Sequence, residues 1–209
     1  REGDYTRSVS YAAVLLCCGA GHWALTAGDR TVLLRLAREA VIAAVRGLPP
    51  PDPHDGRYAL NERLLCARGA FVTLHSPDGS LRGCIGIIEE QLPLVDAVVA
   101  NGRSAAIDDP RFEPVGEDEL DGLHIEVSAL TPLRRAGGPA DIVIGRHGIL
   151  LVKGHRRAVF LPQVALEQGW DLETTLDQLA RKAGLAAGAW RNETELHTFE
   201  AEIAAEERA

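Results

Sequence analysis

The strongest pattern in the sequence is an amphipathic stretch over residues 26–46. Its apolar residues recur every three or four positions, which predicts a helix with one apolar side. Those residues are Leu33, Leu36, Ala37, Ala40, Val41, Ala44 and Val45. Thr26 can cap the start of this helix, and Gly47 with the prolines that follow ends it.

Shorter elements are predicted along the rest of the chain. Strands are predicted over residues 69–75, 81–88 and 123–130, a strand meander over residues 141–161, and helices over residues 93–108 and 171–183. The end of the chain alternates again, so we predict one final strand that carries His197, Phe199, Ala201 and Ile203 on one face. Hairpins mixed with helices, instead of a regular β-α-β alternation, indicate an α+β fold.

The composition narrows the class of protein. Hydrophobic residues make up 46% of the chain and charged residues 25%, as in a folded soluble protein. The net charge of −8 argues against a nucleic-acid-binding surface, because phosphate binding needs a cationic face. The basic cluster Lys153, His155, Arg156 and Arg157 can hold a small anion, although a solvated hairpin turn is the favoured interpretation.

The longest apolar run and the cysteine spacing indicate the cellular compartment of the protein. The run over residues 11–18 is too short to span a bilayer, so no membrane association is predicted. The four cysteines include no C-x-x-C pair, and we expect no disulfide framework. Together these features predict a cytoplasmic protein.

The chemistry of the sequence is concentrated at residues 81–86, where two glycines flank Cys84. Arg82 lies two positions earlier, so in a regular strand both side chains emerge on the same face. An arginine near a thiol favours the thiolate, which is the nucleophilic form. The alternative is a structural Cys84, since unpaired cysteines are often small buried hydrophobes.

Two further residues are candidates for the same site. Glu126 stands among apolar residues of a predicted strand, either as a buried, partnered carboxylate or at a solvent-facing edge position. His147 lies in a glycine-flanked turn, where it is either a base or simply exposed. The spacing of histidines and cysteines predicts no intrinsic metal site, and no cofactor can be assigned.

Several strings along the chain resemble one known family. They are FVTL at residues 71–74, LRGCIG at 81–86, DPRF at 109–112, IEVSAL at 125–130, GRHGILL at 145–151, LPQVA at 161–165 and KAGL at 182–185. The chain resembles the AMMECR domain family, called AmmeMemoRadiSam system protein A in bacteria and archaea. The resemblance implies an α+β fold with a mixed or mainly antiparallel sheet flanked by helices. It also implies a Memo-type protein and a radical S-adenosylmethionine protein as partners, and it implies no established reaction.

The opening of the chain carries a second resemblance. Residues 3–16 are similar to the closing strand of Memo family proteins, which resemble extradiol-type dioxygenases. We therefore expect residues 1–18 to be the remnant of an upstream Memo-like domain, residues 19–25 a linker and residues 26–209 the AMMECR domain. A chain that begins at Arg1 and contains no methionine fits a fragment or a processed product of such a fusion.

Two functions follow as hypotheses. The first is an enzyme component with a cysteine-centred cleft, in which Cys84 acts with Arg82, Glu126 and His147. The alternative is a non-catalytic binding or adaptor module, in which Cys84 is structural and Arg82 anchors an anionic group.

Overall fold

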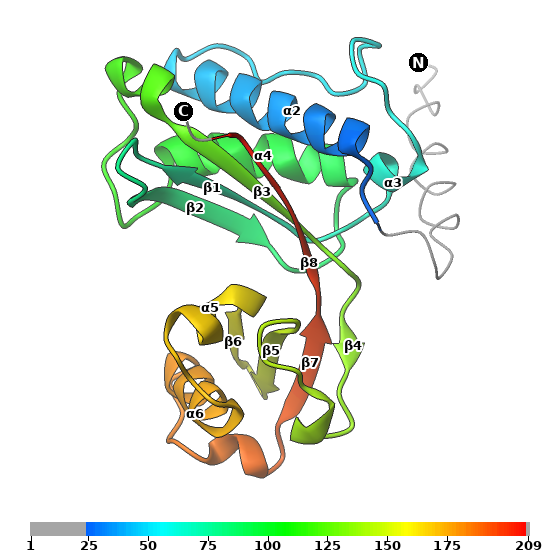
Figure 1. Ribbon diagram of the computed structural model, residues 1–209, viewed down its shortest axis with the longest axis vertical. Helices are drawn as coiled ribbons and strands as arrows, with labels where there is room; N and C mark the ends of the chain where they lie inside the picture. Colours follow the sequence, from blue (N-terminus) through cyan, green and yellow to red (C-terminus); the bar gives the residue numbers. More distant parts are fainter. Residues whose placement is uncertain (1–23, 208–209) are drawn as a thin grey trace, which may run out of the picture. The chain divides into compact units, whose positions relative to one another are not determined.

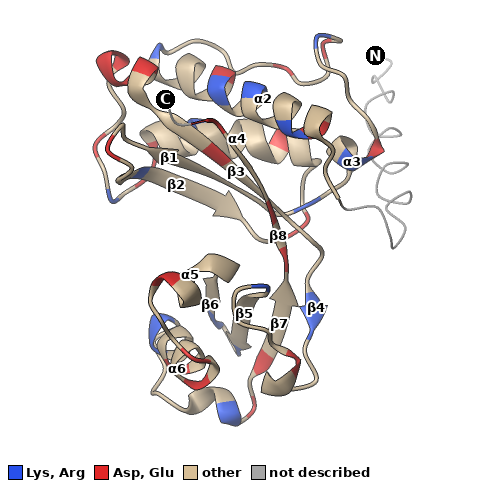
Figure 2. Ribbon diagram, viewed as in Figure 1, with Lys and Arg blue, Asp and Glu red and all other residues tan. Residues whose placement is uncertain are grey.

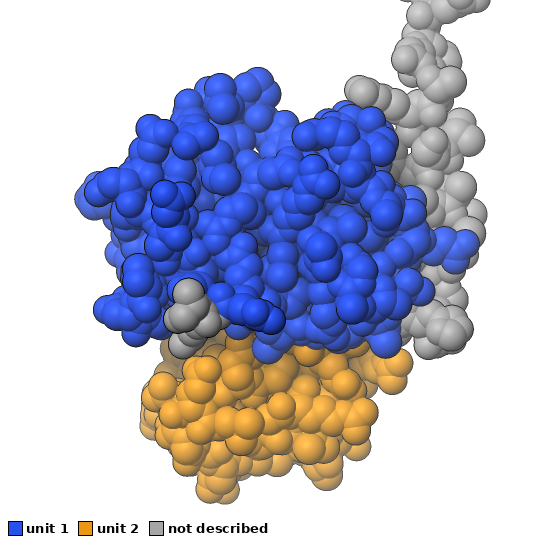
Figure 3. All heavy atoms as spheres, turned by 45° about the horizontal axis from the view of Figure 1, so that its top comes forward, with its two compact units in different colours: residues 1–129, 202–209 blue, residues 130–201 orange. Residues whose placement is uncertain are grey.

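The computed structural model describes residues 24–207, which form two compact units (Figures 1 and 3). Unit 2 is Leu130–Ala201, and unit 1 is formed by the described residues on either side of that segment. The predicted Memo-like remnant, residues 1–18, lies outside the described residues, as does most of the predicted linker. Among the helices of residues 24–207, none is both long and apolar enough to cross a membrane.

Unit 1 contains a four-stranded sheet and helices packed on it (Figure 1). The strand order is β2-β1-β3-β8, and β1 pairs antiparallel with both of its neighbours. The strands are β1 (Ala70–His75), β2 (Leu81–Ile87), β3 (His124–Leu130) and β8 (Ala201–Ala205). The helices are α2 (Ala27–Val45), α3 (Glu62–Leu65), α4 (Leu94–Ile107) and the 3-10 helix η1 (Glu117–Gly122). These elements confirm the α+β fold class.

The alternation along the strands gives this sheet two different faces. On β1, Ala70, Val72 and Leu74 are fully buried in one core with the apolar sides of α2 and α4. The residues between them point to the opposite face. We call this opposite face the distal face. It carries Phe71, Thr73 and His75 of β1, Cys84 and Gly86 of β2, and His124, Glu126 and Ser128 of β3.

The two glycines beside Cys84 are required by packing. A Cβ on Gly83 would lie 2.2 Å from the carbonyl oxygen of Ala105, so α4 approaches β2 too closely for any side chain. A Cβ on Gly86 would lie 2.2 Å from the ring of Phe71 on the neighbouring strand. A glycine in a strand commonly marks such a close approach. Both glycines therefore have a structural reason that involves no ligand.

Unit 2 contains a second antiparallel sheet, in the order β4-β7-β5-β6. Its strands are β4 (Arg134–Arg135), β5 (Gly148–Lys153), β6 (Arg156–Phe160) and β7 (Glu195–Phe199). Its helices are α5 (Pro162–Glu167), α6 (Leu172–Lys182) and the 3-10 helices η2 (Pro139–Asp141) and η3 (Ala189–Arg191). The apolar side of α6, with Leu176 and Leu179 fully buried, packs against the strand residues Ile149 and Leu151.

The prediction of a single final strand is wrong. The segment forms two strands, β7 and β8, which belong to the sheets of different units. The break falls at Glu200, whose N–H donates to Thr131 Oγ1 and whose carbonyl accepts from the Thr131 N–H, both at 2.8 Å. Because this exchange occupies the Glu200 main chain, the ladder of β7 stops there, although the side-chain alternation continues through it.

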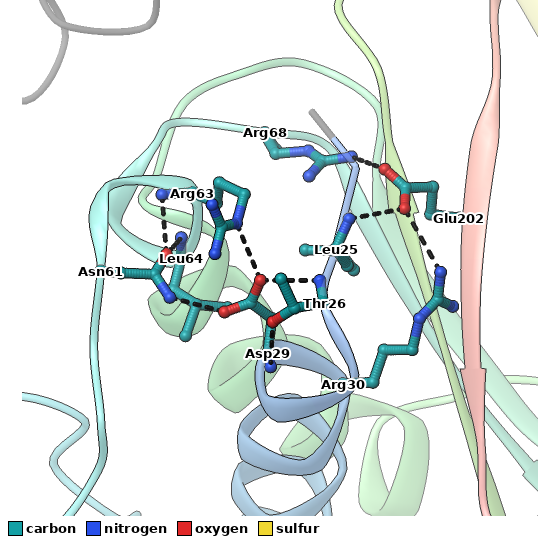
Figure 4. A network of polar contacts seen from close by, with 9 residues as sticks. All are labelled: Leu25, Thr26, Asp29, Arg30, Asn61, Arg63, Leu64, Arg68 and Glu202. Atoms are coloured by element: carbon teal, nitrogen blue, oxygen red, sulfur yellow. Dashed lines mark hydrogen bonds and ion pairs between the residues drawn. The ribbon is translucent and has the colours of Figure 1, made fainter. Parts of the chain in front are cut away.

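The start of α2 is fixed by a polar network (Figure 4). Thr26 and Asp29 form a reciprocal capping box, which satisfies two N–H groups at the helix start. The Asp29 carboxylate also accepts from Asn61 Nδ2 at 2.5 Å and from Arg63 Nε at 2.8 Å. Burial opposes ionisation of Asp29, but these hydrogen bonds outweigh it and hold the pKa of its carboxyl well below the usual range.

The close approach at Gly83 gives a test of this packing. We expect Gly83→Ala to lower the free energy of unfolding by about 1–3 kcal/mol, because the added methyl group must displace main chain of α4. Gly28→Ala is the matched control: its Cβ meets nothing closer than 3.8 Å, and alanine in a helix should stabilise by about 0.5 kcal/mol. Urea unfolding midpoints measure both changes. Equal stability of the two variants would contradict the packing account.

Candidate functional site

Cys84 lies in the middle of β2 on the distal face, and its side chain is partly exposed. It is a free cysteine, and the Thr73 hydroxyl donates to its Sγ at 3.4 Å. Cys66, in contrast, is disulfide-bonded, which the cysteine spacing did not lead us to expect. Cys84 therefore offers an available thiol with one hydrogen-bond donor already on the sulfur.

Glu126 lies in the same row of the distal face as Cys84, where a row is a line of directly paired residues across neighbouring strands. Thr73 pairs with Cys84 on β2 and with Glu126 on β3, so the three side chains follow one another across the sheet. Directly opposed residues of this kind have Cβ atoms about 4.5–5.5 Å apart. Glu126 is partly buried on an interior strand, so it does not occupy the edge position considered from the sequence.

The next row holds two histidines that the sequence analysis did not select. His75 pairs directly with His124 across β1 and β3, and both are partly buried. The alternation along each strand places these histidines on the distal face, because His75 lies two positions after Thr73 and His124 two before Glu126. It becomes visible only when the register of the strands is known.

The main chain of Cys84 is held from outside the sheet by Asp109 and Arg111. The Cys84 N–H donates to Asp109 Oδ2 at 2.8 Å, and its carbonyl accepts from Arg111 Nη2 at 3.0 Å. Since β2 is an edge strand, this side-chain pair takes the place of a further strand. Both main-chain groups thus point away from β1, which makes Cys84 and Thr73 a non-hydrogen-bonded pair with close side chains.

Asp109 and Arg111 form a tight ion pair. Two guanidinium nitrogens of Arg111 donate to the buried carboxylate at 2.9 and 2.7 Å. Hydrogen bonds from Arg111 first, and from the Cys84 N–H, hold the pKa of Asp109 well below its usual range despite burial. The pKa of Arg111 is raised, first by Asp109 and also by the Cys84 side chain. The arginine that contacts Cys84, at its main-chain carbonyl, is therefore Arg111, which belongs to the DPRF string.

Arg82, the arginine selected from the sequence, is engaged elsewhere. Its guanidinium binds the Glu119 carboxylate at 2.7 and 2.8 Å and donates to the carbonyls of Glu113 and Pro114. Hydrogen bonds from Arg82 first, and from the Gly116 N–H, lower the pKa of Glu119 to about 2. Arg82 thus fastens the start of β2 to the segment that precedes β3.

His147 belongs to unit 2, whereas Cys84, Arg82 and Glu126 belong to unit 1. Its Nδ1 accepts from the Val143 N–H at 3.1 Å, so the ring closes its own turn before β5. Nothing in unit 1 is needed to explain this arrangement.

The basic cluster of the sequence surrounds the β5–β6 turn (Figure 2). Lys153 Nζ donates to the Asn192 carbonyl at 2.7 Å, and Arg156 donates to the Gly184 carbonyl just after α6. These two cations bind main-chain carbonyls, which is a structural use of their charge. Among residues 24–207, no group of three or more histidine, cysteine or acidic side chains is arranged to hold a metal ion.

These features define a class of protein: a two-unit α+β domain with a free cysteine on the distal face of an antiparallel sheet. The chain belongs to the AMMECR1 family, whose family model matches residues 34–204.

Its relatives include archaeal proteins of similar length. A protein of Thermococcus onnurineus is 44% identical over 186 residues, covering 84% of this chain and 89% of the relative. Protein MK0488 of Methanopyrus kandleri is 39% identical over 198 residues, covering 88% and 91%. The crystal structure of protein PH0010 from Pyrococcus horikoshii matches with a TM-score of 0.75 at 38% identity, over 82% of this chain and 88% of that chain.

The Arg82–Glu119 pair predicts a pH-dependent contribution to stability. Arg82→Gln should lower the free energy of unfolding by about 1 kcal/mol at pH 7, a value reduced for solvent screening because Glu119 is partly exposed. The pKa of Glu119 is lower in the folded protein than in the unfolded chain. The stabilisation is therefore complete above about pH 4.5 and disappears as the pH falls through about 2.

Thermal unfolding of both proteins between pH 2 and 7 measures this difference. The melting temperatures should converge at the acidic end. Glu117→Gln is the control, because its ion pair with Arg46 is exposed and should contribute less than about 0.5 kcal/mol. A difference between wild type and Arg82→Gln that persists unchanged to pH 2 would rule out the ion pair as its source.

Proposed function

We propose that this protein is an enzyme component whose reactive group is the Cys84 thiol. The observation that carries the proposal is the set of contacts around Cys84. Its main chain is fixed by Asp109 and Arg111, while its partly exposed sulfur receives a hydrogen bond from Thr73. A cysteine thiolate is the nucleophile in covalent catalysis, and here the sulfur already has the Thr73 hydroxyl as a donor.

The residues around the thiol have separate roles in this proposal. Arg111 supplies the positive charge, and Asp109 keeps the guanidinium in place. Glu126 follows Thr73 in the same row, where it can bind a substrate group or exchange a proton with it. Arg82 acts indirectly by fixing the start of β2. A role for His147 stays a prediction from the sequence.

The proposed partners are a Memo-type protein, expected upstream in the same polypeptide, and a radical S-adenosylmethionine protein. Both come from the family resemblance. A cytoplasmic location is proposed from the cysteine spacing and the short apolar run of the sequence.

A non-catalytic adaptor is the second candidate. It is favoured by Gly83 and Gly86, whose packing against α4 and Phe71 accounts for the glycines of LRGCIG without any reaction. In that case Cys84→Ser should leave the binding of a Memo-type or radical S-adenosylmethionine partner intact and have no effect on their joint turnover. A loss of turnover with intact binding would favour the enzyme component.

The charge assignment can be tested by alkylation. At pH 7, Arg111→Gln should slow the reaction of Cys84 with iodoacetamide by about 3- to 10-fold, because the thiolate loses its cation while the Asp109 carboxylate remains. Arg82→Gln, which removes an arginine of the same strand, should change the rate by less than about 2-fold. Peptide mapping under non-reducing conditions isolates the signal of Cys84 from that of Cys66.

Two outcomes would count against this proposal. A wild-type rate no greater than that of a cysteine in an unfolded peptide would remove the nucleophile role of Cys84. A slower reaction in Arg82→Gln than in Arg111→Gln would restore Arg82 as the orienting arginine.

A further inference from the structure

His75 is the feature of the distal face that the contacts described so far do not explain. It ends β1, and its Nδ1 is buried without a hydrogen-bond partner in the described part of the chain. A buried polar atom is costly unless a partner satisfies it, so His75 Nδ1 needs a partner such as a water molecule or a bound group.

The strand register places His75 beside the thiol. Thr73 pairs with Cys84, and His75 is the next residue of β1 on the same face, so His75 and Cys84 are diagonal neighbours. Such neighbours are about 7–8 Å apart at the main chain, within reach of long side chains. A base acts on a proton directly or through one water molecule, so the side chains must close this main-chain spacing.

The pairing of β1 with β2 is irregular at this point. Leu74 pairs with Gly83 while His75 pairs with Leu81, so Arg82 is an extra residue opposite His75. Bulges of this kind occur next to active sites, where they re-aim a side chain. The extra residue, Arg82, is itself bound by Glu119.

The strand register places charged and titratable groups of two neighbouring strands beside His75. On β3, His124 lies directly opposite and Glu126 lies diagonally. On β2, Cys84 lies diagonally and Arg82 lies in the bulge. Cys84 and Glu126 can stabilise a protonated imidazole when they are ionised, and His124 opposes it when it is protonated.

We propose that His75 is the base that accepts the thiol proton of Cys84, so that the distal face carries a thiolate–imidazolium pair. This proposal rests on the proposed function of Cys84. In the step, the S–H bond breaks and the proton moves to an imidazole nitrogen through one water molecule. The sulfur electron pair then forms an S–C bond with an electrophilic carbon of the substrate, and the leaving group departs with the bonding pair and takes the proton from His75.

The test is the pH profile of Cys84 alkylation by iodoacetamide between pH 5 and 10. Wild-type Cys84 should react faster at pH 7 than a cysteine in an unfolded peptide. His75→Gln should raise the midpoint by about one pH unit and slow the reaction at pH 7 by about 10-fold. His124→Gln is the matched control, one strand further from the sulfur, and should change the rate by less than about 2-fold.

A second measurement needs no substitution at His75. The imidazole of His75, followed by NMR, should titrate at a lower pH in Cys84→Ser than in the wild type, because coupling between two sites is reciprocal. This measurement decides the question if His75→Gln does not fold.

The failures of the two proposals are distinguishable. If wild-type Cys84 reacts no faster than an ordinary cysteine, the nucleophile role fails, and the pair fails with it. If wild-type Cys84 reacts rapidly while His75→Gln keeps the same profile, or while the His75 titration ignores Cys84→Ser, only the base assignment is overturned.

Discussion

The buried side chain of Arg68 joins the two parts of unit 1 between which the chain passes through unit 2. The Arg68 side chain is fully buried and contacts the Ala129 carbonyl at 3.4 Å and the Glu202 carboxylate at 3.6 Å. These two residues border the segment that forms unit 2. Glu202 also accepts from the Leu25 N–H at 2.7 Å, which ties in the start of α2 (Figure 4). Burial lowers the pKa of Arg68 and Glu202 opposes this shift, so the buried charge depends on the Glu202 carboxylate.

Arginine–carboxylate ion pairs also bind the other edge of the sheet. There, Arg111 with Asp109 and Arg82 with Glu119 bind β2, much as Arg68 with Glu202 binds β8. Arginine suits this task because its planar fork of donors can satisfy a carboxylate and main-chain carbonyls together. Because these ion pairs bind both edge strands, the side chains of Cys84, Thr73 and Glu126 on the distal face are not needed to hold the edges of the sheet.

The sequence predicted the local elements of unit 1 well and the tertiary relations poorly. Helical periodicity located α2 and α4, and alternation located β1, β2 and β3, because these patterns depend on local geometry. The same alternation runs unbroken through Glu200, so it could not reveal two sheets. For the site, the sequence identified Cys84 and Glu126. Their register, the engagement of Arg82 with Glu119 and the approach of Arg111 depend on contacts between distant segments.

The structural and the catalytic interpretations of Cys84 concern different atoms. Its main chain is part of the edge of the sheet, bound by Asp109 and Arg111, and the neighbouring Gly83 is part of the packing of α4. The thiol takes part in neither and is partly exposed beside Thr73. A rigid main chain with an available side chain is what positions a nucleophile, because a reactive group must be held by its supports and not by its own reactive atom. The contacts that make this strand structural are therefore compatible with the chemistry proposed for its sulfur.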